Sequence, residues 1–253
     1  MIIYIAGYGR SGSTLLDIVL ANSENVSTLG EIGKIVSERT IITNKFYADI
    51  LFRTIESLKL SEKELNEIAL ADRSFNRFNS KYKDFWTLFL ENSKIEQEKS
   101  IFVDSSKTTW HTLFRPSNLS KTGFEVKIIF LKASYKKVWK SALKGSNSSL
   151  QDSTSTPKKL YFFAFRTLVS KFFTDLLTNM LYNNKSHKLI KVNYVNFTDD
   201  PENTLKSISD KLEIDFKNLD DKIANNQFLV KGGYSGNRLR KEGTVIKIKK
   251  SDK

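Results

Sequence analysis

The chain has 253 residues, 40% of them hydrophobic, which suits a single globular domain with a sizeable core. Its 41 lysines and arginines outnumber its 28 aspartates and glutamates, and the net charge of +13 favours anionic ligands such as nucleotides, nucleic acids, membrane surfaces or acidic glycans. Cysteine is absent, which excludes disulfides and a thiolate nucleophile, and two histidines leave little material for a zinc site.

Short apolar runs with strand character alternate along the chain with segments of helical periodicity. They lie at residues 2–6, 26–29, 101–103, 126–131 and 189–195. This alternation predicts an α/β fold in which helices flank a central parallel sheet. The first apolar run begins at once, with no basic leader and no cleavage site, so we expect a cytoplasmic protein.

We expect one domain over residues 1–253, with a helical insertion at about residues 34–100. Within it, Ser61 followed by Glu64 predicts a helix that begins with a capping box. Residues 145–157 are rich in serine and threonine and almost without apolar anchors, which predicts a mobile surface loop. Whether this loop is a lid over an acceptor or only a connection stays open.

A long helix is expected from about Lys158. Charged residues interrupt the apolar stretch 160–181, so we interpret it as a core helix and expect no membrane span. Its predicted core face follows three- and four-residue steps through Ala164, Leu168, Phe172, Leu176 and Met180.

A glycine-rich loop, Gly7-Tyr8-Gly9-Arg10-Ser11-Gly12-Ser13-Thr14, connects the first predicted strand to a predicted helix. Backbone N–H groups of such a loop and the following helix N-terminus can cradle an anion. The Walker A lysine is missing, because Ser13 occupies its place, and this disfavours an ordinary ATPase. Arg10 offers a cation inside the loop instead; the simpler interpretation is a glycine-rich turn with one exposed arginine.

Together with four later segments, this loop resembles the sulfotransferase family. The run from Gly7 to Leu29-Gly30-Glu31 looks like the family's phosphosulfate loop, first helix and second strand. The further matches follow in family order at residues 103–107, 127–141, 192–205 and 235–240. The resemblance implies a P-loop-like fold and transfer of a sulfuryl group from 3′-phosphoadenosine-5′-phosphosulfate (PAPS) to a hydroxyl acceptor, with 3′,5′-adenosine bisphosphate as the product.

The resemblance also implies residue roles at the 5′ side of the donor. The phosphosulfate would be held by Arg10, Ser11, Gly12, Ser13 and Thr14. Lys107 would reach the bridging oxygen, although a plain surface lysine is the alternative. Arg10 and Lys107 would then stabilise charge on the leaving phosphate.

An attacking hydroxyl must lose its proton, so a general base is expected opposite the sulfuryl group. Glu31 is the first candidate, because it follows the second strand at the sheet edge where ligands bind and resembles the glutamate base of tyrosylprotein sulfotransferases. The alternative for Glu31 is a helix N-terminal glutamate stabilised by the helix dipole. His111 is the second candidate, although its spacing from Lys107 exceeds that of the cytosolic family members.

The 3′-phosphate segment departs from the family pattern. The family's usual arginine falls on Ala133, whereas Ser141 matches. Lys132 or Lys136 is expected to supply charge nearby. The C-terminal residues Asn237, Arg238 and Arg240 are expected to close over the nucleotide, the alternative being a solvated basic loop.

Two other functions remain open at this stage. A P-loop nucleotide or small-molecule kinase would need a carboxylate for magnesium, for which Asp104 is the nearest candidate. A decayed sulfotransferase would bind an anionic partner without turnover, and a nucleic-acid binder would use the net charge of +13, although we expect no nucleic acid. The acceptor (sugar, tyrosine, lipid or small alcohol) and the oligomeric state are not determined by the sequence.

Overall fold

The fold is described from a computed structural model of the chain. It describes residues 1–39, 42, 44–97, 99–109, 111–143, 157–183, 189–234 and 243–250. The predicted loop at 145–157, apart from Pro157, and the C-terminal residues Asn237, Arg238 and Arg240 lie outside the described residues.

Five parallel strands form the central sheet, as the alternation of apolar runs predicts. They are β1 (Ile2–Ala6), β2 (Val26–Gly30), β3 (Ile101–Asp104), β4 (Val126–Lys132) and β5 (Leu189–Asn193). Their order is β2-β3-β1-β4-β5, so β1 lies in the middle and its end opens into the glycine-rich loop. A separate antiparallel pair joins β6 (Phe228–Leu229) to β7 (Val245–Ile246).

The last sheet strand ends two residues earlier than the sequence predicts. β5 stops at Asn193, whose side chain accepts a hydrogen bond of 2.8 Å from the Val195 N–H and so caps the short helix α9 (Tyr194–Asp199). An asparagine at this position favours a helix start over continued strand. As a result, Tyr194 leaves the sheet edge and faces the glycine-rich loop.

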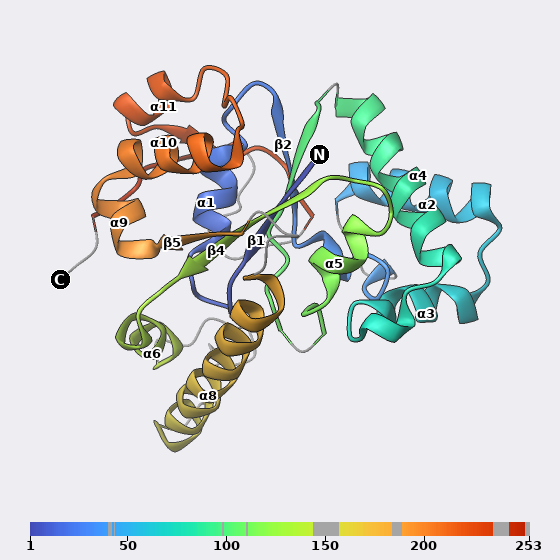
Figure 1. The fold of residues 1–253 in the computed structure, drawn as a ribbon, viewed down its shortest axis with the longest axis horizontal. Helices are drawn as coiled ribbons and strands as arrows, with labels where there is room; N and C mark the ends of the chain where they lie inside the picture. The colour runs from blue at the N-terminus through green and yellow to red at the C-terminus, as the bar shows by residue number, and fades with distance from the viewer. Residues whose placement is uncertain are drawn as a thin grey trace.

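Helices cover both faces of the sheet (Figure 1). One face packs against α1 (Ser13–Leu20), α10 (Pro201–Leu212) and α11 (Asp220–Ala224), with Ile3 and Ile5 of β1 in the shared core. The opposite face, which includes Ile2 and Tyr4, packs against the helices contributed by residues 32–97 and against α5 (Arg115–Ser120). The period-two alternation of β1 thus places successive side chains in two separate cores.

Residues 32–97 are mostly helical, in agreement with the predicted insertion. Their elements are η1 (Ile32–Lys34), α2 (Lys45–Leu58), α3 (Glu62–Ala71), η3 (Phe75–Arg77) and α4 (Ser80–Gln97). The predicted capping box is confirmed, because the Glu64 N–H donates to Ser61 Oγ and the Ser61 N–H donates to Glu64 Oε2 at 2.8 Å.

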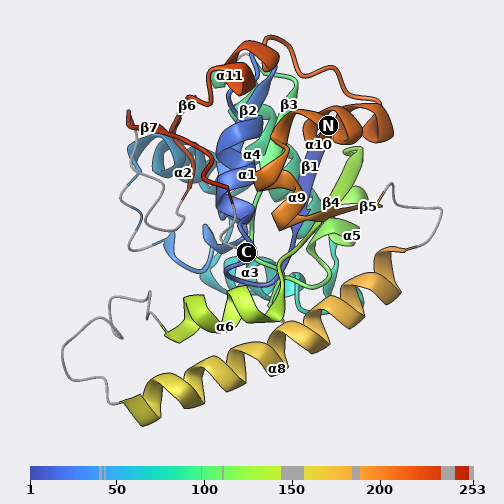
Figure 2. The ribbon, with the colours of Figure 1, turned by 90° about the vertical axis from the view of Figure 1, so that its left-hand side faces the viewer.

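The prediction that the long helix packs in the core is wrong. α8 (Pro157–Tyr182) follows α6 (Tyr135–Leu143) and lies along one end of the molecule (Figure 2). Phe172, Leu176 and Met180 are 52%, 44% and 68% exposed, whereas Ala164 of the predicted face is buried. The buried side of α8 is mainly polar, whereas the periodicity of apolar residues predicted that the apolar side would be buried. Among the described residues, no helix is long and apolar enough to cross a membrane.

Candidate active site

The loop between β1 and α1 is shaped to receive an anion. Gly12 caps α1 with φ 99°, in the left-handed region, and a Cβ there would lie 2.3 Å from the Tyr194 ring. Glycine is therefore required both by the backbone and by the close approach of Tyr194. The next residues, Ser13 and Thr14, are buried in the first turn, where helix N–H groups lack intrahelical acceptors. The Ser11 hydroxyl is also buried, and in the described part of the chain it has no hydrogen-bond partner.

The segment after β3 is attached to this loop by a pair of hydrogen bonds. The Gly7 N–H donates to Thr108 Oγ1 and the Thr108 N–H donates to Gly7 O, both at 3.1 Å. This attachment brings Lys107 over the loop, because a Cβ placed on Gly9 would lie 3.6 Å from Lys107 Cδ. The Lys107 side chain therefore lies beside the glycine-rich loop.

Glu31 sits directly after β2 and is almost fully buried, with 2% of its side chain exposed. Its carboxylate is 2.7 Å from Lys107 Nζ and 3.0 Å from Lys34 Nζ. Burial acts to raise the pKa of Glu31, but the two ammonium groups outweigh burial and hold the pKa below its usual value. Glu31 is thus an ionised, buried carboxylate in contact with Lys107, the lysine beside the glycine-rich loop.

Backbone contacts fix the position of Glu31. The Glu31 N–H donates to Tyr234 O at 2.7 Å, and the Tyr234 N–H donates to Leu29 O at 2.9 Å. The Tyr234 hydroxyl donates to Glu38 at 3.0 Å. Tyr234, the last described residue before this C-terminal segment, therefore lies beside Glu31.

Arg10 does not point into the loop as the sequence expects. Its Nη1 donates to Ser141 O at 2.6 Å and to Ser141 Oγ at 3.1 Å, and its guanidinium lies 5.6 Å from the centre of the Phe163 ring. Arg10 itself has φ 74°, an uncommon conformation for a residue with a side chain. Arg10 and Ser141 are therefore brought together, and they join the loop to α6 and α8.

Lys137 is the cation near this junction that sequence reasoning missed. It lies on α6 one helical turn before Ser141, and its ammonium group lies over the ring of Tyr194, the same ring that approaches Gly12. Within the described ranges the ammonium has no hydrogen bond or ion pair, and burial lowers the pKa of Lys137 to about 7. The four-residue step from Lys137 to Ser141 was the available signal, since it places the two side chains on one face of α6.

Lys132, the other expected cation, lies elsewhere. It is exposed at the end of β4, with its ammonium 5.1 Å from the centre of the Phe130 ring. It lines a separate cavity of about 390 Å³ together with Ala133 and Lys171. Lys136 is exposed on α6, so neither lysine is placed at the Arg10–Ser141 contact.

A larger cavity of about 690 Å³ opens on the other side of Lys107. Its walls come from η1, α3 and the segment after β3, and they include Lys34, Arg73, Lys107 and His111. His111 is exposed at this cavity, whereas Glu31 lies behind the two lysines that bind it. Lys107 and His111 thus line one cavity, and Glu31 contacts Lys107 from behind the cavity wall.

Asp104 belongs to a buried network beneath this cavity. Its Oδ2 accepts a hydrogen bond from Arg115 Nε at 2.7 Å and its Oδ1 accepts one from the Ser106 N–H at 2.9 Å. Arg115 also binds Asp72 at 2.9 Å and lies 4.1 Å from the centre of the Trp86 ring. The network joins the helical insertion to the sheet and orients the segment that carries Lys107.

Comparison with known proteins supports the fold. No protein-family model and no curated protein matches the sequence. A sulfotransferase domain from the curacin biosynthetic pathway aligns with a TM-score of 0.54 and 18% identity over 86% of this chain and 75% of that chain. A sulfotransferase from Mycobacterium avium aligns with a TM-score of 0.49 and 13% identity over 96% of this chain and 72% of that one. At these identities the likeness concerns the fold alone, and the first alignment carries it: the chain has the fold of a sulfotransferase domain.

Proposed function

We propose that the protein is a sulfotransferase that uses PAPS as donor and transfers the sulfuryl group to a hydroxyl of its acceptor. The observation that supports this most is the contact between the buried Glu31 carboxylate and Lys107 beside the glycine-rich loop. It places a proton acceptor and a cation within 2.7 Å of each other at the anion cradle. Sulfuryl transfer needs both, one for the attacking hydroxyl and one for the leaving phosphate.

The buried polar atoms of the loop fit a phosphosulfate. The unpartnered Ser11 hydroxyl and the helix N-terminus at Ser13 and Thr14 offer donors to oxygens of the 5′ group. Lys137, whose ammonium has no hydrogen bond or ion pair within the described residues, offers a cation on α6 one helical turn before Ser141. We assign it to the 3′-phosphate, where it would take over the role of the family's arginine.

Glu31 would act as the base during in-line displacement. The hydroxyl oxygen forms a bond to sulfur as the bond from sulfur to the phosphate oxygen breaks, and the hydroxyl proton passes to the Glu31 carboxylate. Lys107 would turn from Glu31 toward the leaving oxygen, which removes one of the two cations that lower the pKa of Glu31. The buried carboxylate then becomes a stronger base at the moment when the proton must be taken.

The cavity of about 690 Å³ would hold the acceptor. Exposed Arg73 and His111 face it, together with Asn66 of α3, so its polar groups are mainly donors and cations. We therefore favour a polar or anionic hydroxyl compound over a wholly apolar alcohol. The single acceptor remains to be found by screening.

The kinase alternative is weakened by the position of Asp104. Both of its carboxylate oxygens already accept hydrogen bonds, from Arg115 and from the Ser106 N–H, and the side chain is fully buried. A carboxylate held in this way is not directed at a metal beside the loop. A decayed protein that binds an anion without turnover differs from the main proposal only in its missing activity.

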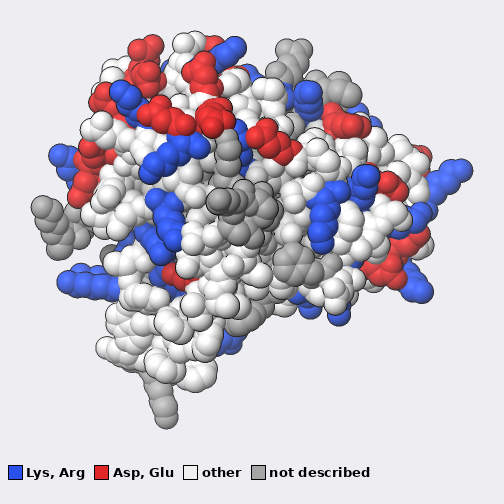
Figure 3. All heavy atoms as spheres, in the orientation of Figure 1, with Lys and Arg blue, Asp and Glu red and all other residues white. Residues whose placement is uncertain are grey.

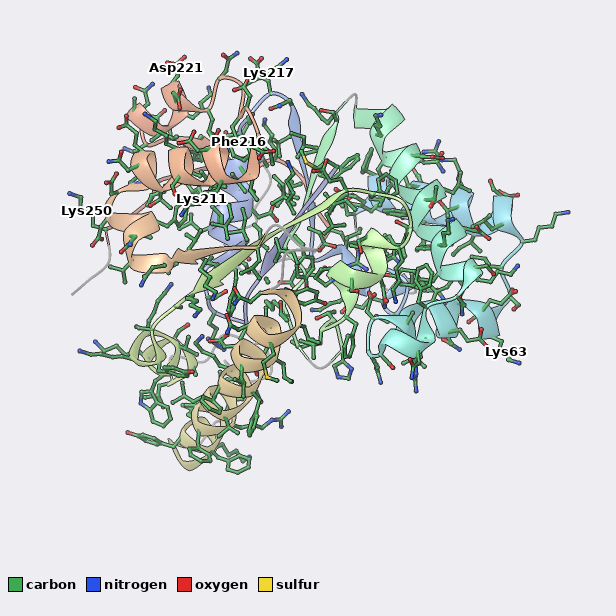
Figure 4. All side chains as sticks on the ribbon, viewed as in Figure 1. Lys63, Lys211, Phe216, Lys217, Asp221 and Lys250 are labelled. Atoms are coloured by element: carbon green, nitrogen blue, oxygen red, sulfur yellow. The ribbon has the colours of Figure 1, made fainter. Side chains whose placement is uncertain are left out.

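Calorimetric titration with 3′,5′-adenosine bisphosphate, run beside ATP with magnesium, tests the donor site. We expect bisphosphate to bind and ATP with magnesium to bind more weakly. Arg10→Ala removes the contacts that join the glycine-rich loop to Ser141 of α6 and should weaken bisphosphate binding. Lys63→Ala changes a residue on α3 away from this loop (Figure 4) and should not. Absence of bisphosphate binding, or a preference for ATP with magnesium, contradicts the proposal. Bound bisphosphate without turnover of PAPS across an acceptor screen would instead identify the decayed alternative.

A further inference from the structure

Helix α8 has its polarity reversed relative to an ordinary surface helix. Its inward residues recur every three or four positions and are mainly polar. They are Ala164, Thr167, Lys171, Thr174, Thr178 and Tyr182. Most of its exposed residues are apolar, and these form what we call the outward face. This face consists of Tyr161, Phe162, Phe165, Val169, Phe172, Phe173, Leu176 and Met180.

Specific polar contacts hold the inward stripe in place. Lys171 is 1% exposed, binds Asp175 and lies 5.1 Å from the centre of the Tyr135 ring on α6. At the end of the helix, the buried Tyr182 hydroxyl donates to Leu113 O at 2.6 Å. Rotating α8 to bury its apolar side would break the contacts with Tyr135 and Leu113 and move buried polar groups, so the outward face belongs to the fold itself.

An apolar surface of this extent is unusual on a soluble protein that acts alone. Phe162, Phe165 and Met180 are 69%, 61% and 68% exposed, and they lie on one side of a helix of 26 residues. Contiguous exposed apolar patches of this kind mark interaction sites with proteins or membranes. The question is therefore which partner covers this face.

The charges around the outward face select an anionic partner. Exposed Lys136 and Lys140 on α6, and Lys159 and Arg166 on α8, flank it. In the described parts of these two helices the acidic residue is Asp175, which is bonded to Lys171. Figure 3 shows the surface over α8 as largely white, with Lys and Arg at its margin. A second copy of the chain would bring the same cations to the contact without facing acids.

We propose that the outward face of α8 docks on an anionic membrane surface. A helix with aromatic and aliphatic residues on one side and cations beside them lies in the interfacial plane of a bilayer, with its apolar side among the acyl chains and its cations at anionic headgroups. Because α6 begins just after β4 ends and Phe163 of α8 contacts Arg10, docking would hold the glycine-rich loop close to the lipid surface. This inference does not depend on the proposed sulfotransferase activity.

Sedimentation of the full chain with lipid vesicles tests it. Wild-type protein should bind phosphatidylcholine vesicles that contain phosphatidylglycerol, bind less as salt is raised, and bind far less to phosphatidylcholine alone. The triple variant Phe165→Ser, Phe172→Ser and Leu176→Ser should lower the partition coefficient by about a hundredfold, since each lost side chain contributes roughly fivefold. The pair Lys159→Gln and Arg166→Gln should lower it by about tenfold, since each basic residue near an anionic surface contributes roughly several-fold.

Matched variants separate docking from unfolding and from general stickiness. Phe52→Ser removes an aromatic that is 60% exposed on α2, and Lys217→Gln removes a cation at the opposite end of the molecule (Figure 4); both should bind vesicles as wild type does. All variants change exposed residues and should melt as wild type does. The proposal is overturned if wild type does not bind the anionic vesicles, or if the triple variant binds them equally. It is also overturned if sedimentation velocity shows a dimer that the triple variant abolishes while vesicles are not bound.

Discussion

Arg115 and Lys137 are two cations withdrawn from solvent, and their surroundings are opposite. Arg115 is 1% exposed and has two carboxylates, Asp104 and Asp72, within 2.9 Å. Lys137 is partly buried; its ammonium lies over the Tyr194 ring, and among the described residues it has no hydrogen bond and no carboxylate partner. Burial acts to lower the pKa of both; the two carboxylates reverse this for Arg115, whereas burial prevails for Lys137.

This difference distinguishes Arg115, a cation that stabilises the fold, from Lys137, a cation that is available to bind an anionic ligand. A buried cation with its own anions is complete and holds neighbouring elements together. A partly buried cation without an anion gains its partner only when an anionic ligand binds. Glu31 lies between these two cases, because its partner Lys107 is also the lysine beside the glycine-rich loop.

Replacing Arg115 tests the structural half of this comparison. Arg115→Met leaves Asp104 and Asp72 buried without their cation and should lower the free energy of unfolding by about 3–5 kcal/mol, measured by urea denaturation. Lys137→Met removes a charge that lacks an anion, so its stability should equal or exceed that of wild type. Equal losses for both variants would remove the distinction.

Glu31→Gln tests the intermediate case. The amide cannot take up a proton, so turnover with an acceptor found by screening should fall roughly 10²–10⁴-fold, while bisphosphate affinity stays within about twofold. Single-turnover kinetics and calorimetry measure the two effects. His111→Gln is the matched control, since His111 lines the same cavity but does not contact Lys107 in an ion pair. Loss of turnover in the histidine variant alone would make His111 the base.

Lys137→Met tests the ligand half of the comparison. Loss of a charge-assisted contact to phosphate should weaken the binding of 3′,5′-adenosine bisphosphate by roughly tenfold, as measured by calorimetry. Adenosine 5′-monophosphate, which lacks the 3′-phosphate, should show a much smaller effect. The matched control Lys136→Met changes an exposed lysine on the same helix and should bind the bisphosphate as wild type does. An equal loss for the two nucleotides would remove Lys137 from the 3′-phosphate.

The pH dependence of bisphosphate binding gives the smallest effect. In the free protein the pKa of Lys137 is about 7, and a bound phosphate raises it, so the complex favours the protonated form. The affinity for bisphosphate should therefore be highest below about pH 7, where Lys137 is protonated in the free protein. Above about pH 7 it should fall by at most about tenfold per pH unit. Calorimetry from about pH 7 to about pH 9 should show this slope for wild type and a shallower one for Lys137→Met. Identical slopes would contradict the assignment.

Parts of the site were predictable because their geometry is local. A strand, a glycine-rich loop and a helix in direct succession define the anion cradle, and Glu31 follows the next strand by one residue. Lys107 was found through the family resemblance of residues 103–107, and the parallel pairing of β1 with β3 brings it to the same edge of the sheet. Lys137 and the direction of Arg10 were missed, because both depend on where α6 and Tyr194 pack against the loop.

Helix α8 shows why periodicity can mislead. The sequence determined that residues near 158–182 are helical and that apolar side chains gather on one side. It could not determine which side faces inward, because a hydrophobic stripe is attracted equally to a core and to an external partner. Only the tertiary structure decided this, through the contacts of Lys171 with Tyr135 of α6 and of Tyr182 with Leu113. Patterns along the chain thus determined where helices and strands form. Contacts between distant residues determined which charged side chains are paired and which apolar surfaces are exposed.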